Sequence, residues 1–180
     1  MRQIQGNLFS LPSYLPEWIN PDNWTTSRWR TAISRKKISV PLRICLETKL
    51  PEGDWLDFGC WRGDDVSNIS LFRSNIYGFD PYWQPEFELL SRNWSVISCV
   101  YVLNVVETHN ERIQVLRFIF ERARNALIVA VRCDGSGEKL TNINTFQKYF
   151  TRMEFADFLE AVFPENEVNI LRPGVAIIKK

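Results

Sequence analysis

Short apolar runs recur along the chain and alternate with segments whose apolar residues fall three or four positions apart. The runs at 96–103 and 126–131 are apolar at nearly every position, which is typical of parallel strands covered on both faces. The turn residues Pro173 and Gly174 separate the last two runs, as expected for a hairpin. The predicted strands are 55–59, 75–80, 96–103, 126–131, 168–171 and 175–178.

Helical spacing and capping residues predict helices between these strands. Ser39 is a suitable N-cap for a helix over 39–50, and a second helix is expected over 63–72. Thr108 and Thr151 each precede a glutamate by three positions, which is the pattern of a capping box, and apolar residues continue behind both at helical spacing. Two longer helices are therefore expected in the second half of the chain.

Strands that alternate with helices predict an α/β fold, Rossmann-like, with a parallel sheet and a C-terminal antiparallel hairpin. Only about 15 residues separate Asp80 from the strand at 96–103, which is too few for another helix and strand. We therefore expect the sheet to be shortened after its second strand. Gly135 and Gly137 predict a turn-rich loop before the last helix.

The chain has 180 residues, of which 45% are apolar and 24% charged, a balance that suits one globular domain and excludes a disordered chain. We expect an N-terminal arm with a basic aromatic segment over 1–38, because prolines interrupt regular structure there, and an α/β domain over 39–180. No apolar run approaches the roughly 18 to 20 residues that span a bilayer, and the N-terminus lacks an apolar signal segment. The prediction is a cytoplasmic protein with no membrane partner.

The four cysteines are widely spaced, form no C-x-x-C pair, and have only His109 as a further soft ligand. Neither a zinc site nor a redox dithiol is indicated, so no metal is expected. The net charge of +1 says little about partners, and the oligomeric state stays open.

A local excess of positive charge follows the prolines, since no acidic residue lies between Asp22 and Glu47. Basic side chains beside Trp24 and Trp29 suit a phosphate backbone whose bases are available for stacking, which makes nucleic acid a possible partner. A solvated basic face anchored by two tryptophans explains the same pattern. The basic residues are Arg28, Arg30, Arg35, Lys36, Lys37 and Arg43.

The segment 54–66 reads as a strand that ends in a glycine-bearing turn and continues into a helix start. Gly59 and Gly63 would let the backbone approach a ligand closely, and the helix start offers free amides. Asp80 ends the next strand 23 residues after Asp57, about the separation at which an acid reaches a ribose diol. Together these features indicate an adenosine-containing cofactor, although a tight turn and a turn-initiating Asp-Pro pair would leave the same pattern.

Four segments carry a family resemblance. They are 34–39, 59–66, 101–107 and 145–151, and the run Thr-Phe-Gln-Lys-Tyr in the last is the most specific. With them the chain, from about Thr31 to near its C-terminus, resembles the DNA-phosphorothioation-associated methyltransferases, a family of class I S-adenosylmethionine-dependent type. The resemblance implies S-adenosylmethionine as cofactor and a nucleic-acid-related methyl acceptor.

The resemblance also implies roles for individual residues. Asp57 would hold the ammonium of the cofactor and Asp80 its ribose, while Asn104 would orient the acceptor and Glu107 accept a proton. Loop polarity near a helix start explains the last two equally well. The remaining cofactor contacts would be Gly59, Cys60, Trp61, Gly63 and Pro81.

The candidate substrate contacts follow from position instead. They are Gln147, Lys148 and Tyr149, in the loop before the last helix where open α/β sheets place substrates, and Arg28 and Arg30 of the basic segment. Burial of Phe146 and Phe150 under the helix, with Lys148 in water, explains the loop equally well.

The turn departs from the family pattern at one position, where Trp61 replaces the middle glycine. If that position requires a positive φ, tryptophan costs on the order of 1 to 3 kcal/mol and adds bulk. A methyltransferase-like fold that has lost its cofactor and binds nucleic acid or protein is therefore the alternative. A nicotinamide-dependent oxidoreductase is disfavoured, because the short segment after Asp80 leaves no room for a full dinucleotide-binding half.

Overall fold

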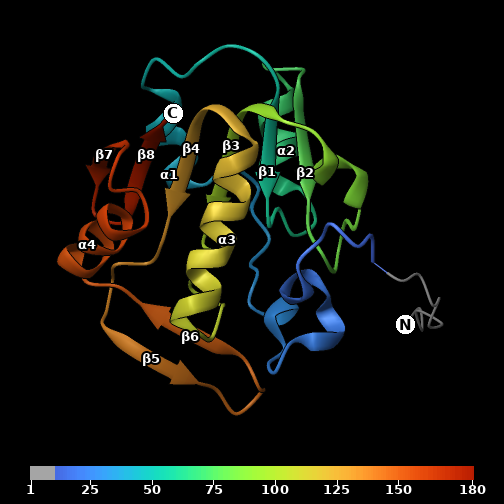
Figure 1. Ribbon diagram of the computed structural model, residues 1–180, viewed down its shortest axis with the longest axis vertical. Helices are drawn as coiled ribbons and strands as arrows, with labels where there is room; N and C mark the ends of the chain where they lie inside the picture. Colours follow the sequence, from blue (N-terminus) through green and yellow to red (C-terminus); the bar gives the residue numbers. More distant parts are fainter. Residues whose placement is uncertain (1–10) are drawn as a thin grey trace.

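The computed structural model describes residues 11–180, so the part of the predicted arm over residues 1–10 lies outside the described residues. The described part of the chain builds a six-stranded sheet in the order β2-β1-β3-β4-β8-β7 (Figure 1). The first four strands are parallel, and β8 is antiparallel to both of its neighbours. The strands are β1 (Trp55–Phe58), β2 (Ile76–Phe79), β3 (Trp94–Val100), β4 (Ala123–Ala130), β7 (Glu167–Arg172) and β8 (Val175–Lys179).

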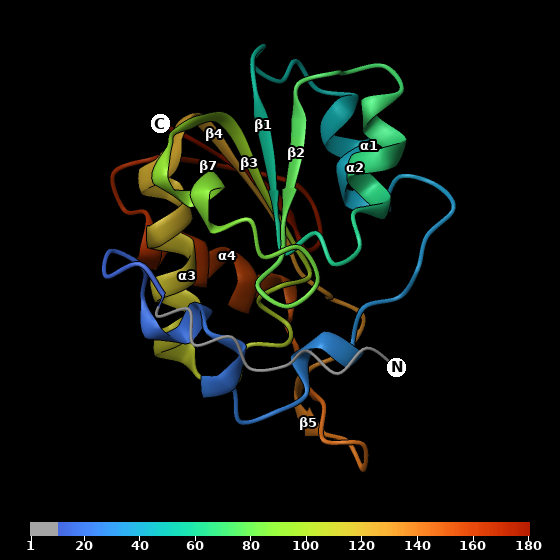
Figure 2. The same ribbon diagram turned by 90° about the vertical axis from the view of Figure 1, so that its right-hand side faces the viewer.

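Helices cover both faces of the sheet, which makes three layers (Figure 2). α1 (Val40–Leu46) and α2 (Asp64–Ser70) pack on one face, and α3 (His109–Arg122) and α4 (Arg152–Val162) on the other. β3 and β4 are buried on both faces, as their apolar runs predict. The α/β class, the parallel sheet and the C-terminal hairpin are confirmed. The shortened sheet is confirmed as well, since only turns and the 3-10 helix η4 (Phe87–Ser91) connect β2 to β3.

Several element boundaries differ from the prediction. β3 begins at Trp94 and ends at Val100, because Tyr101 has a positive φ of 63° that breaks the strand before the end of the apolar run. α1 ends at Leu46 rather than at residue 50. Apolar content alone does not mark these ends, since residues 101–103 stay apolar after the strand has turned.

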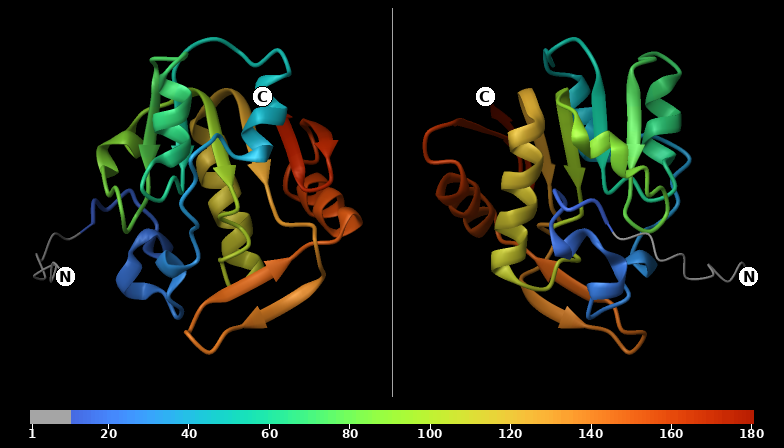
Figure 3. Two further views of the ribbon diagram at one scale, coloured as in Figure 1. Left: turned by 180° about the vertical axis from the view of Figure 1, so that it is seen from behind. Right: turned by 45° about the vertical axis from the view of Figure 1, so that its right-hand side comes forward.

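The expected loop before α4 is wrong, because it contains a hairpin of β5 (Gly137–Leu140) and β6 (Phe146–Tyr149). All four residues of β5 are exposed, so the strand has no apolar alternation that could reveal it. The hairpin lies at the end of the sheet where the arm also lies (Figure 3). Thr151 and Glu154 form the full predicted capping box, whereas Thr108 caps α3 without a return bond from Glu111.

The arm, here residues 11–38, folds into three single turns of 3-10 helix and joins the core through buried Leu15 and Ile19. The turns are η1 (Glu17–Ile19), η2 (Pro21–Asn23) and η3 (Arg28–Arg30). No helix within residues 11–180 has the length and hydropathy that crossing a membrane requires. The same residues contain no group of three or more His, Cys, Asp or Glu side chains placed to hold a metal ion.

Candidate functional site

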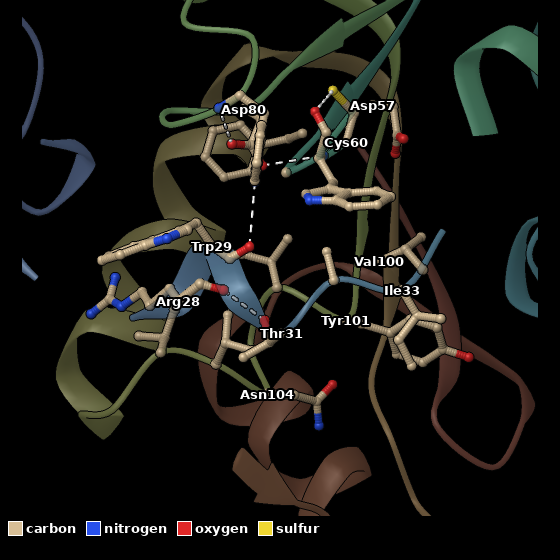
Figure 4. Close-up of a pocket in the computed structure, with 18 of the residues that line it drawn as sticks. Arg28, Trp29, Thr31, Ile33, Asp57, Cys60, Asp80, Val100, Tyr101 and Asn104 are labelled. Carbon is tan, nitrogen blue, oxygen red and sulfur yellow. Dashed lines mark hydrogen bonds between the residues drawn. The ribbon is translucent and has the colours of Figure 1, made fainter. Parts of the chain in front are cut away.

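A cavity of about 700 Å³ opens where β1, β2 and β3 end, and the arm forms much of its opposite wall. Asp57, Cys60 and Asp80 lie along one side of it and Asn104 on the other (Figure 4). This is the edge at which open α/β sheets bind ligands. The predicted site residues that line it are Asp57, Gly59, Cys60, Trp61, Asp80, Pro81, Arg28, Asn104 and Gln147. Those that do not line it are Gly63, Arg30, Glu107, Lys148 and Tyr149.

Asp57 is the most deeply buried acid of the cavity wall, with 4% of its surface exposed. Its Oδ1 accepts a hydrogen bond of 2.6 Å from the Ser98 hydroxyl, which in turn accepts one of 2.9 Å from the Trp55 indole. Burial raises the pKa of Asp57 to about 7, against the bond from Ser98, and the nearby Asp65 carboxylate adds to the rise. A cation in the cavity would favour the ionised carboxylate.

The turn after β1 holds three residues in the left-handed region, namely Gly59 at φ 77°, Trp61 at 53° and Gly63 at 82°. A Cβ on Gly59 would lie 2.2 Å from the Val102 Cγ2 atom, and one on Gly63 would lie 2.7 Å from the Gln84 Nε2 atom. Gly59 is therefore required by its φ and by the overlap with Val102, whereas Gly63 is favoured by its φ alone, because the end of the Gln84 side chain can move aside.

We expect Gly59→Ala to destabilise the fold by about 2 to 4 kcal/mol, through backbone strain and overlap with Val102. Val102→Ala removes the atoms that would overlap with the new Cβ. In the Val102→Ala background, the loss of stability caused by Gly59→Ala should therefore fall to the part that comes from backbone strain. Urea unfolding of the two single variants and the double variant measures both parts. An equal cost in both backgrounds would mean that Val102 does not limit this position.

Trp61 lies in the cavity wall with its ring edge-on to Trp83 at 6.0 Å, and Arg62 stacks over both rings. Its indole Nε1 is buried and has no hydrogen-bond partner among the described residues, and the same holds for the Ser39 hydroxyl in the same wall. Buried polar groups are normally satisfied, so two such groups in one cavity are what a bound ligand would complete.

Asp80 uses its carboxylate to hold the turn that follows β2. Oδ1 accepts from the amides of Tyr82 and Trp83 at 2.9 and 2.8 Å, and Oδ2 accepts from the amide of Trp61 at 3.1 Å. Burial raises its pKa even though these three bonds lower it. Asp80 thus does form the turn, as its position before Pro81 predicts. Each carboxylate oxygen has two lone pairs, so Oδ2 keeps one for a ribose hydroxyl, and that role stays a prediction.

Neither protein-family models nor curated proteins match the sequence. Among solved structures, the 1,6-didemethyltoxoflavin-N1-methyltransferase of Burkholderia thailandensis, solved with S-adenosylhomocysteine, matches with a TM-score of 0.55 and 17% identity over 78% of this chain and 76% of that one. A sugar N-methyltransferase of Streptoalloteichus sp. matches at 0.54 and 11%, over 78% and 85%. An S-adenosylmethionine-dependent methyltransferase of Clostridium acetobutylicum matches at 0.52 and 9%, over 77% and 87%.

The chain has the fold of S-adenosylmethionine-dependent methyltransferases. At these identities the likeness concerns the fold alone. None of the three structures named above points to the DNA-phosphorothioation-associated family in particular, so that narrower resemblance is not supported.

Asn104, the predicted acceptor-orienting residue, follows the third strand of this methyltransferase fold with both ends of its amide engaged. Nδ2 donates to the carbonyl of Lys148 at 2.5 Å, and Oδ1 accepts from the amide of Arg132 at 3.1 Å. The residue is 1% exposed. Its side chain therefore fastens β6 to the sheet, and acceptor contact by this amide stays a prediction.

Arg28 of the arm forms ion pairs with Glu107, just before α3, and with Glu111 in the first turn of α3. The guanidinium of Arg28 donates to both carboxylates, and Thr26 donates to Glu107 at 2.5 Å. Burial raises the pKa of Glu107, but the hydrogen bonds from Arg28 and Thr26 outweigh burial, so the pKa lies below its ordinary value. This arrangement argues against phosphate binding by Arg28 and against proton acceptance by Glu107, since each charge is already compensated.

The other predicted substrate residues are distributed unevenly around the cavity of the methyltransferase fold. Gln147 lines it from β6, whereas Lys148 pairs with Glu154 at 3.2 Å and Tyr149 lies under Arg132. Arg30 is exposed on the arm. Of the three residues predicted in the loop before α4, only Gln147 lines the cavity and could contact a ligand there.

Sequence reasoning missed several residues of the cavity wall. Trp29 stacks on Tyr82 with ring centroids 4.9 Å apart, and Arg35 lies over the ring of Tyr101. Ser39 and Asp65 are joined by a bond of 2.6 Å from the Ser39 amide to Oδ1. The segment 34–39 is one of those that carried the family resemblance, and this was the available signal. Nothing in local spacing predicts that the arm crosses the strand ends.

Proposed function

We propose that this protein binds S-adenosylmethionine at the ends of β1 and β2 and transfers its methyl group to an acceptor. The observation that carries the proposal is the cavity itself, which in a methyltransferase fold brings Asp57 and Asp80 together with two buried polar groups that have no partner within residues 11–180. Solved neighbours of the same fold include one crystallised with S-adenosylhomocysteine, which supports the cofactor.

The residues present fit such a ligand. Asp57 supplies an anion for the ammonium of the methionine part, and the free lone pair of Asp80 suits a ribose hydroxyl. The Ser39 hydroxyl and the Trp61 indole offer further bonds. When bound, the sulfonium supplies an electrophilic methyl carbon: an acceptor lone pair forms the new bond, the carbon–sulfur bond breaks, and its electron pair stays on sulfur. In-line placement by the cavity walls is the chain's main contribution, so no dedicated general base is required.

The predicted nucleic-acid-related acceptor and the link to DNA phosphorothioation are not part of this proposal. Arg28 is compensated by two glutamates and Lys148 by one, so the cations expected to meet a phosphate backbone are already paired. The neighbours named above also include proteins described by small-molecule and sugar acceptors.

Calorimetry with S-adenosylhomocysteine tests the proposal, and Trp61 variants sharpen it. Trp61→Phe keeps most of the bulk and removes the indole donor, so we expect it to bind the ligand roughly fivefold more weakly, for about 1 kcal/mol. Trp61→Gly relieves the positive φ in the free and the bound protein alike, so it should stabilise the fold by about 1 to 3 kcal/mol without restoring the affinity that the indole supplies. Unchanged binding in both variants would mean that the indole does not contact the ligand, and no heat from any of the three proteins rejects the proposal.

A second candidate is a methyltransferase-like binding module without cofactor, which is favoured by the left-handed Trp61 in the cavity wall. The exposed cations Arg30, Lys36, Lys37 and Arg43 would then face an anionic partner. This candidate requires DNA binding that weakens steeply with salt, ignores S-adenosylhomocysteine and is lost when Arg30, Lys36 and Lys37 become glutamine. Binding of S-adenosylhomocysteine at the strand ends would exclude it.

A further inference from the structure

The side of the cavity away from Asp57 and Asp80 differs in character from the side that would hold the cofactor. Apolar residues of the arm, of the segment after β3 and of α3 form it. We call this the arm-side chamber; its apolar residues are Trp18, Trp24, Val105, Val106 and Val115. Val106 and Val115 are only 2% and 1% exposed, so most of the apolar surface of the chamber comes from the partly exposed Trp18, Trp24 and Val105.

Charge at the chamber is cancelled within the chain. Arg28 lies over the Trp24 ring at 5.1 Å, but its guanidinium is bonded to Glu107 and Glu111. Arg132, which lines the cavity nearby, pairs with Asp134 at the end of β4. Arg35 also lines the cavity and has no ion pair among residues 11–180, but its charge acts on Asp57, on the opposite side from the chamber. A phosphate or carboxylate held among the five apolar residues of the chamber would lose water without gaining an unpaired cation there, and burying a charge in this way is costly.

Polar groups of the chamber wall are nearly all used. The Asn104 amide is bonded at both ends, and the Thr145 hydroxyl is 2.7 Å from that of Thr141. Gln147 also lines the cavity, and its side-chain amide makes no hydrogen bond with the described residues. The wall therefore offers one amide to a ligand amid apolar surface.

We infer that the arm-side chamber takes the methyl acceptor, and that the acceptor is a small, uncharged, largely apolar molecule with one polar group for Gln147. The identification of the bound molecule as a methyl acceptor rests on the proposed function. The selectivity of the chamber follows from its lining alone, because apolar cavities in proteins accept apolar guests. The whole cavity measures about 700 Å³, and the cofactor and the acceptor would share it, so the acceptor must be small.

Calorimetry with naphthol and naphthyl phosphate tests the inference, since these probes share one ring system and differ in charge. With S-adenosylhomocysteine present, naphthol should bind the wild type, and naphthyl phosphate should bind at least about tenfold more weakly. Val105→Phe fills the chamber and should weaken naphthol at least about tenfold without changing S-adenosylhomocysteine affinity. Gln147→Met keeps the side-chain length and should weaken naphthol less than Val105→Phe does. Ile143→Phe adds the same ring type at an exposed hairpin position and serves as the matched control.

The possible outcomes separate the two proposals. Equal or tighter binding of naphthyl phosphate, no naphthol binding, naphthol binding insensitive to Val105→Phe, or displacement of naphthol by a DNA duplex at low salt would each overturn the inference. If S-adenosylhomocysteine fails to bind while naphthol behaves as expected, methyl transfer is rejected and the selectivity of the chamber stands.

Discussion

Arg28→Met is expected to destabilise the protein by about 3 to 5 kcal/mol at neutral pH, because it leaves two glutamates facing each other with little access to water. The side chains of Arg28, Glu107 and Glu111 are only 9%, 14% and 15% exposed. Arg28 also joins the arm to the start of α3, so its loss should release the arm from the cavity wall. Urea unfolding followed by tryptophan fluorescence measures the stability, and proteolysis within residues 28–37 measures arm release.

Arg30→Met is the matched control, since Arg30 is two positions away and exposed, and its replacement should stay within about 0.5 kcal/mol. The effect of Arg28→Met should shrink in acid. The folded-state pKa of Glu107 is lowered, so the stability that its ionised form contributes is present above its ordinary pKa and is lost as the pH falls through the folded value. Adding Glu107→Gln should recover part of the loss. If Arg28→Met unfolds within about 1 kcal/mol of the wild type at pH 7, the cluster is not formed in solution.

The sheet was predictable because burial leaves a direct mark on sequence. β3 and β4 are buried on both faces and therefore apolar at almost every position, and the capping residues located both long helices. The cavity was predictable in outline from the same strands, since parallel strands place their carboxyl ends at one edge. This is why Asp57, Cys60 and Asp80 meet as expected.

The prolines predicted the arm, but local pattern did not predict its contacts. Arg28 binds partners 79 and 83 positions away, and both its charge and that of Glu107 read in sequence as available for chemistry. The fully exposed β5 carries no alternation, so Gln147 appeared to lie in a loop. Tertiary contacts decide whether a charged residue is free to bind a ligand or is used in an ion pair within the fold, and the local pattern of a single sequence does not show these contacts.

Asp57→Asn is expected to stabilise the protein at pH 8 by up to about 4 kcal/mol, while leaving stability near pH 4 unchanged. Burial raises the folded-state pKa of Asp57 to about 7, about 3 above that of an ordinary aspartate. Between these values the folded state holds a proton that the unfolded state has lost, so stability falls as the pH rises through the window and is lowest above it. Asparagine has no charge to bury and keeps a carbonyl oxygen for the Ser98 hydroxyl. Urea unfolding at pH 4, 6 and 8 gives the comparison.

Stability and function should then move in opposite directions at this residue. A carboxylate whose ionised form is disfavoured by burial gains most from a cation, so Asp57→Asn should weaken S-adenosylhomocysteine binding while it strengthens the fold. Asp157→Asn, at an exposed position of α4, removes the same charge without either effect and controls for net charge. A stabilisation that is equal at pH 4 and pH 8 would show that the carboxyl of Asp57 does not titrate in this window. A buried acid with a raised pKa in a cavity wall is a candidate for a functional role, because burial makes its charge costly and a bound cation offsets that cost. Unchanged ligand affinity would show that the charge of Asp57 does not serve the site.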